Sequence, residues 1–104
     1  MFEITASGRL GADPWERFDG DMLVVCAWLW CDLRDDGAWI YLIAAKPALA
    51  DILSGLRKDD RVTVSGEVSA VKIHADGPPF IELVAYSIAP CRGMVEAEQT
   101  LAVH

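Results

Sequence analysis

Alternation of apolar and polar residues is the feature that most constrains how this chain of 104 residues folds. From Phe2 to Leu10, and again from Arg61 to Val68, an apolar residue or glycine alternates with a polar one. A period of two places successive side chains on opposite faces of a strand, whereas a helix needs a period near 3.6. Both segments are therefore predicted to be β-strands with one face against a core and the other in water.

Three further segments are rich in the β-branched and aromatic residues that favour strands. They are Met22–Cys31, Trp39–Ala45 and Phe80–Ile88. Turn-forming residues at 11–14, 18–21, 32–37 and 75–79 bound the predicted strands. The chain is therefore predicted to have five strands.

A single short helix is predicted over residues 47–56. Pro47 suits the first turn of a helix, where its missing N–H is not needed. Apolar residues then recur at helical spacing. Five strands with one helix between strands 3 and 4 are typical of the OB-fold, a partly open barrel. The predicted fold class is all-β, a five-stranded OB-fold Greek-key barrel.

The length of the chain suits one domain. We assign residues 1–92 to the OB-fold domain and residues 93–104 to a C-terminal tail or short helix. No run of about 18 uncharged apolar residues is present, so no transmembrane helix and no membrane partner are expected. The first residues, Met1–Ile4, lack the basic and apolar regions of a signal peptide, and a cytoplasmic location is expected.

Acidic residues outnumber basic ones, sixteen to nine, for a formal net charge of -7. Affinity for a phosphate backbone comes largely from counterions released by bound Lys and Arg, so this charge disfavours tight binding of nucleic acid. A local basic stripe can still act within a Debye length of about 10 Å. Cys26, Cys31 and Cys91 form no CxxC pair and are expected to be free thiols. No metal site and no cofactor are predicted.

Several segments follow a known family pattern in order and spacing. Residues 8–14 fit G-x-L-G-x-D-P, and residues 56–68 are similar to L-x-K-G-D-x-V-x-V-x-G. Residues 39–43 and 81–85 look like the third and fifth strands of the same pattern. Over residues 2–90 the chain thus resembles the bacterial single-stranded DNA-binding proteins. The resemblance implies an OB-fold, a homo-oligomer (dimer or tetramer), and a role in DNA replication, repair and recombination.

The chain also departs from this family pattern. Asp59 stands where the family's turn has glycine, and Ala45 and Ile73 stand where it has stacking aromatics. The family's long tail with an acidic tip has no counterpart before His104, so recruitment of enzymes through such a tail is not expected.

Four aromatic residues are candidates for stacking with bases, which sequence-tolerant binding of single strands requires. If the second and third strands form a hairpin around Arg34–Asp35, Trp30 can pair with Trp39. The same register then pairs Trp28 with Tyr41, so four rings share one face. The opposite face, the predicted interior, would carry Ala27, Leu29, Ile40 and Leu42.

The roles of these residues differ in the prediction. Trp39 matches a stacking position of the family and is predicted to bind. For Trp28 and Trp30, packing or self-association is the favoured alternative to binding. Trp15 is placed in a loop, either as an exposed anchor or as a lid on the barrel end.

Three cations are predicted to flank the binding groove, with a solvated surface charge as the alternative for each. They are Arg9, Lys46 and Lys72. Arg57, Lys58 and Arg61 are predicted to solvate the turn after the helix.

The predicted function is largely sequence-independent binding of single-stranded DNA, by base stacking and backbone electrostatics on the sheet face. The alternative is a protein–protein interaction or assembly module that keeps the fold and binds DNA weakly or not at all. No nucleotide-binding, metalloprotease or hydrolase motif is present. The chain is therefore predicted not to be an enzyme, and no small-molecule substrate is expected.

Overall fold

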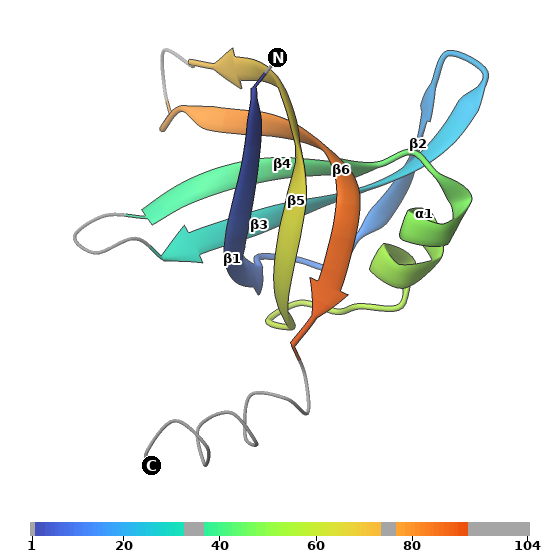
Figure 1. The fold of residues 1–104 in the computed structure, drawn as a ribbon, viewed down its shortest axis with the longest axis horizontal. Coiled ribbons are helices and arrows are strands. Elements are labelled where there is room, and N and C mark those ends of the chain that lie inside the picture. Colours follow the sequence, from blue (N-terminus) through green and yellow to red (C-terminus); the bar gives the residue numbers. More distant parts are fainter. Residues whose placement is uncertain (1, 33–36, 74–76, 92–104) are drawn as a thin grey trace.

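The computed structural model describes residues 2–32, 37–73 and 77–91. The predicted turn around Arg34–Asp35 and the predicted tail over residues 93–104 lie outside these ranges. Figure 1 shows six strands and one helix. In chain order they are β1 (Glu3–Leu10), β2 (Trp15–Asp19), β3 (Met22–Asp32), β4 (Gly37–Ala44), α1 (Pro47–Ser54), β5 (Arg61–Lys72) and β6 (Phe80–Pro90).

Five of these strands, β1, β3, β4, β5 and β6, are those predicted from the sequence, and α1 lies between the third and fourth of them as expected. The prediction of only five strands was wrong, because β2 is a sixth. It forms a hairpin with β3 through a turn at Gly20, whose φ of 65° favours glycine. Trp15 therefore begins a strand and does not lie in a loop, and residues 18–19 belong to β2 and not to a turn.

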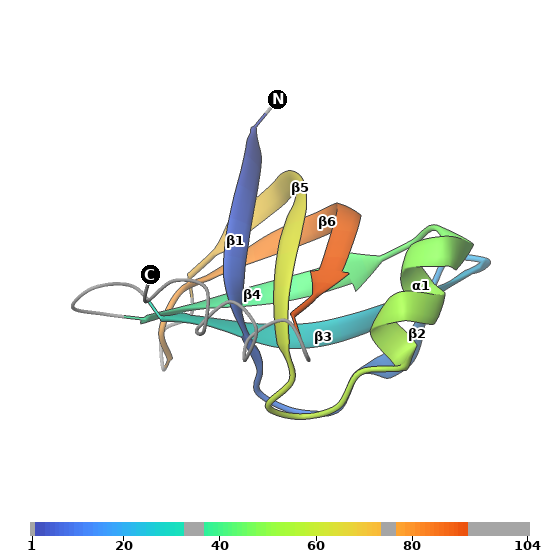
Figure 2. The same cartoon turned by 60° about the horizontal axis from the view of Figure 1, so that its bottom comes forward.

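The strand pairings form a circuit. The sheet has the order β1-β5-β6-β4-β3-β2, and β1 also pairs with β3 through Arg9↔Trp30 and Leu10↔Leu29. All pairs are antiparallel except β4 with β6, which is parallel. In Figures 1 and 2, β1 and β5 cross the β3–β4 pair steeply, and α1 lies near the end that carries the β2–β3 hairpin.

The core lies inside this circuit. The predicted interior residues Ala27, Leu29, Ile40 and Leu42 are all buried, which confirms the predicted face. Helix α1 contributes the buried Leu49 and Leu53; it ends at Ser54, two residues earlier than predicted. Burial of each such leucine stabilises the fold by about 1.5–3 kcal/mol. Within the described residues, no helix has the length and apolar character needed to cross a membrane.

A second, smaller apolar cluster lies on the outer face of β3 and β4. Val24, Cys26 and Ile43 are buried there, and Trp15 and Tyr41 are among the partly buried residues packed against them. The first residue of β2 lies opposite Cys26, so the hairpin brings the Trp15 ring over this cluster. The unpredicted strand therefore extends the packing to the outside of the sheet.

The two sequence motifs that carry the family resemblance meet at the end of β1. The Leu10 N–H donates to the Asp60 carbonyl at 3.0 Å, and the Asp59 N–H donates to the Leu10 carbonyl at 2.9 Å. The Lys58 N–H donates to Asp13 Oδ1 at 2.8 Å. The residues of both motifs thus form hydrogen bonds to one another, and these bonds hold the loop after β1 against the turn before β5.

Candidate functional site

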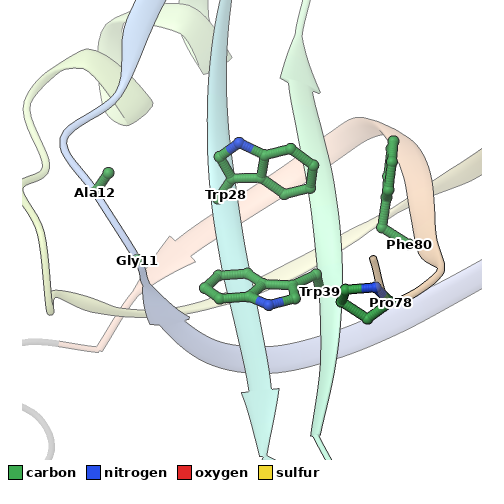
Figure 3. Close-up of a pocket in the computed structure, with 6 residues that line it drawn as sticks. All are labelled: Gly11, Ala12, Trp28, Trp39, Pro78 and Phe80. Carbon is green, nitrogen blue, oxygen red and sulfur yellow. The ribbon is translucent and has the colours of Figure 1, made fainter. Parts of the chain in front are cut away.

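The predicted register between β3 and β4 is confirmed. Trp30 lies opposite Trp39, and Trp28 lies opposite Tyr41. All four rings are partly buried and lie on the face away from the core. Figure 3 shows Trp28 and Trp39 next to each other on β3 and β4, and their rings meet edge to face.

These rings belong to a continuous aromatic cluster. Ring centroids are 4.8 Å apart for Trp30 and Trp39, 6.1 Å for Trp39 and Trp28, and 5.1 Å for Trp28 and Tyr41. Phe80 lies 5.0 Å from Trp28. These tilted and edge-to-face contacts are the geometries that aromatic pairs favour.

Two members of the cluster were not predicted. Trp15 contacts Tyr41 at 5.9 Å from β2, which was not expected as a strand. Phe80 joins because β6 pairs in parallel with β4, which sets it opposite Trp39. Parallel partners are remote in sequence, so no turn between them indicates their register.

Five cross-strand pairs join six residues into one row around the outside of the sheet. Neighbours in the row lie directly opposite one another, so their side chains share a face. The row begins and ends on β5 and places three adjacent rings between cations. In order, this outer row is Arg61, Arg9, Trp30, Trp39, Phe80 and Lys72.

Of the three predicted cations, the structure brings two to this row. Arg9 and Lys72 are exposed members of it. Lys46 lies beyond the other end of β4 from Trp39, as the residue directly before α1, and its side chain forms no capping hydrogen bond there. Arg61, predicted only to solvate a turn, is the first member of the row because β1 and β5 pair in this register.

Three adjoining pockets follow the outer row. The first, of about 340 Å³, lies between the loop after β1 and the start of β6 (Figure 3). The second, of about 350 Å³, shares Gly11 and Trp39 with the first. The third, of about 450 Å³, shares Arg9 and Trp30 with the second. Together they form a hollow track from the aromatic face to the β1–β5 pair.

Two glycines set the positions of the tryptophan rings in this track. A Cβ on Gly11 would lie only 2.7 Å from two ring atoms of Trp39. A Cβ on Gly37 would overlap the Trp30 ring. Both rings therefore lie directly against backbone, which limits their freedom to turn before a ligand arrives.

Charges of both signs lie on this face. Arg17 lies over the Tyr41 ring, 5.7 Å from its centroid, in a cation–π contact that was not predicted. Burial, followed by a hydrogen bond with Cys26, raises the pKa of Tyr41 to about 12, so this ring is neutral at physiological pH. Asp59 lines the second pocket, and Glu82 lies opposite Tyr41. These two carboxylates would repel an anionic ligand.

The two positions at which the family pattern has stacking aromatics lie outside the cluster. Ala45 packs against the second apolar cluster. Ile73 follows β5 and is 82% exposed. Neither supplies a ring, so the aromatic surface of this chain is built mainly on β3, β4 and β6.

Comparison with known proteins gives matches in structure only. No protein-family model and no curated protein sequence matches the chain. The small single-stranded DNA-binding protein from Streptomyces coelicolor matches with a TM-score of 0.71 and 16% identity, over 86% of this chain and 93% of that one. The mitochondrial single-stranded DNA-binding protein Rim1 from S. cerevisiae matches with a TM-score of 0.69 and 18% identity, over 85% and 90%.

These matches confirm the predicted resemblance at the level of fold. The chain is mostly β, with one short helix between β4 and β5, like the OB-fold single-stranded DNA-binding proteins. The TM-scores of 0.69 and 0.71 establish the shared architecture, whereas the identities of 16–18% leave the ligand to be argued from the site itself.

Proposed function

We propose that this protein binds single-stranded DNA with little sequence preference, along the outer row. The observation that carries the proposal is the order of that row, in which three adjacent rings lie between cations at both ends. Two proteins of similar fold are themselves named single-stranded DNA-binding proteins. The proposal includes no catalytic step.

The row has dimensions that suit a short stretch of single strand. Paired strands lie about 4.8 Å apart, so its five steps span roughly 24 Å. Bases stacked on Trp30, Trp39 and Phe80 would each contribute about 1–3 kcal/mol, while Arg9 and Lys72 attract the phosphates. The first pocket is lined by glycine, alanine, proline and aromatic residues, which offer little to distinguish one base from another.

We also interpret the circuit of five strands as the predicted OB-fold barrel, to which β2 is added at the edge of β3. Assembly into a dimer or tetramer and a cytoplasmic location stay predictions. The outer row lies within a single chain, so the proposed binding does not depend on assembly.

The direct test removes the central ring. Fluorescence anisotropy of labelled oligo-dT at low salt should show binding by the wild-type protein and roughly tenfold to hundredfold weaker binding by Trp39→Ala, because a stacked base is lost. Phe18→Ala is the matched control, since Phe18 is aromatic and 70% exposed but lies on the β2–β3 hairpin, outside the row. Equal affinities of wild type and Trp39→Ala would refute this site.

The alternative function, a protein–protein assembly module, rests on a different observation. Phe18, Met22 and Leu23 expose apolar surface on the hairpin, at 70%, 51% and 45%. Exposed apolar residues that lie together often mark interaction sites. Absence of oligo-dT binding by the wild-type protein at low salt would favour this alternative.

A further inference from the structure

Two arginines lie directly opposite each other at one end of the outer row. Arg9 on β1 pairs with Arg61 on β5, and both side chains are exposed. Like charges in directly opposed positions destabilise a sheet. Within residues 2–32, 37–73 and 77–91, neither guanidinium forms an ion pair with a carboxylate. The described residues thus leave this pair of positive charges without a carboxylate partner, although the chain has sixteen acidic residues.

The third pocket places hydroxyl groups beside these arginines. Ser7 and Thr63 line it, and their hydroxyl oxygens are 2.8 Å apart in a hydrogen bond. None of the described residues that line this pocket carries a carboxylate, and Trp30 forms part of its wall. One of the two O–H groups donates in this bond, so the other is left to donate to a ligand. Two guanidinium forks beside such a hydroxyl donor suit the oxygens of a phosphate.

The two ends of the row differ in charge. Two arginines lie at the β1 end, whereas Lys72 is the one row cation beyond Phe80. An internal phosphodiester carries one negative charge, while a terminal phosphate carries about -1.5 to -2 at pH 7. The charge of the arginine pair therefore matches a terminal phosphate better than an internal one.

We propose that the Arg9–Arg61 pocket binds a phosphate group and prefers the terminal phosphate monoester of a DNA strand whose bases lie along the row. The preference for a strand end rests on the proposed function. The pocket adjoins the second pocket through Arg9 and Trp30, so a strand on the rings can reach it without leaving the surface. Binding at this pocket would fix one end of the DNA strand at the β1 end of the outer row.

The test compares three short dT oligonucleotides of equal length, with a 5′-phosphate, a 3′-phosphate or neither, as competitors of labelled oligo-dT. One of the phosphorylated strands should bind about threefold to tenfold more tightly than the unmodified strand. Arg61→Gln should abolish this gain, and Arg61→Lys, which keeps a charge without the fork, should retain part of it. Lys58→Gln is the control, because this exposed lysine lies outside the pocket.

A second measurement separates this proposal from the proposed function. Titration with inorganic phosphate should shift the amide NMR signals of Ser7, Arg9 and Thr63 in the wild-type protein and in Trp39→Ala, but not in Arg61→Gln. If inorganic phosphate causes these shifts but the wild-type protein does not bind oligo-dT, the phosphate pocket is supported and the proposed function is rejected. If neither terminal phosphate improves the affinity of a protein that binds oligo-dT, or if the gain persists in Arg61→Gln, the terminal-phosphate proposal is wrong.

Discussion

Asp59 combines an unfavourable backbone conformation with an unfavourable charge. Its φ of 73° lies in the left-handed region, where the family pattern has glycine. Its N–H donates to the Leu10 carbonyl, which holds the turn in this conformation against the end of β1. The residue also lines the second pocket beside Arg9 and Trp30. One side chain therefore affects both the stability of the turn and the potential along the outer row.

Asp59→Gly should raise the free energy of unfolding by up to about 1 kcal/mol, since relief of left-handed strain exceeds the added freedom of the unfolded chain. It should also tighten oligo-dT binding, because a negative charge leaves the track. Chemical denaturation and anisotropy measure the two effects. Asp59→Asn separates them: it should tighten binding with little change in stability, since asparagine tolerates this conformation. Unchanged affinity in both variants would mean that the Asp59 carboxylate does not face the bound strand.

At the scale of elements, the β2–β3 hairpin is the part of the fold that the sequence pattern did not predict. In residues 15–19 the two large apolar residues, Trp15 and Phe18, are three positions apart and so fall on opposite faces of a strand, and all but Trp15 are exposed. The pairing with β3 nevertheless sets Trp15 opposite Cys26, which is fully buried. The hairpin thus covers the second apolar cluster and supports Tyr41 from one side.

Trp15→Ala should reduce the free energy of unfolding by about 2 kcal/mol, roughly half the effect for a fully buried aromatic ring. In a Cys91→Ser background it should also make Cys26 reactive toward a thiol reagent in the folded protein, because the covering ring is gone. Phe18→Ala, on the same hairpin but exposed, should change stability by less than about 0.5 kcal/mol. An unreactive Cys26 in the Trp15 variant would show that other residues suffice to cover it.

At the scale of the whole molecule, the positive charge of the outer row contrasts with the negative net charge of the chain. The net charge is -7, yet Arg9, Arg61 and Lys72 share the outer row. Long-range repulsion by the acidic surface is screened beyond about 10 Å at 0.1 M salt, whereas contacts in the row are closer than that. The proposed binding is therefore local, modest in strength and dependent on salt.

The salt dependence of oligo-dT binding measures how many row cations neutralise phosphates. Three such contacts predict a slope of about -2 in a plot of log affinity against log salt, since each contributes roughly 0.7 for a single strand. Arg9→Gln and Lys72→Gln should each reduce the slope by about 0.7, whereas Lys46→Gln should leave it unchanged. A reduced slope in Lys46→Gln would place the strand along the α1 end of β4 instead.

The sequence alone determined which face of most strands is buried and how β3 pairs with β4. Alternation in β1 and β5 indicated their inner faces because side chains alternate along any strand. The register of Trp30 with Trp39 was predictable because a hairpin joins strands that are adjacent in the chain. The sequence pattern therefore predicted four rings of the site.

Tertiary structure alone decided what lies on either side of those rings. Phe80 lies opposite Trp39 through a parallel pairing, and Arg9 lies opposite both Trp30 and Arg61 through two partners of β1. The sequence of a strand shows which side chains face the core. It does not show which strand lies next to it, because the backbone hydrogen bonds along its edges can form with any strand whose apolar side chains face the same way. Closing the circuit of strands selects among those partners. The face that carries the rings thus followed from local pattern, and Arg9 and Lys72 were already candidates from the sequence. Their order along the row, and the inclusion of Phe80 and Arg61, followed from the fold.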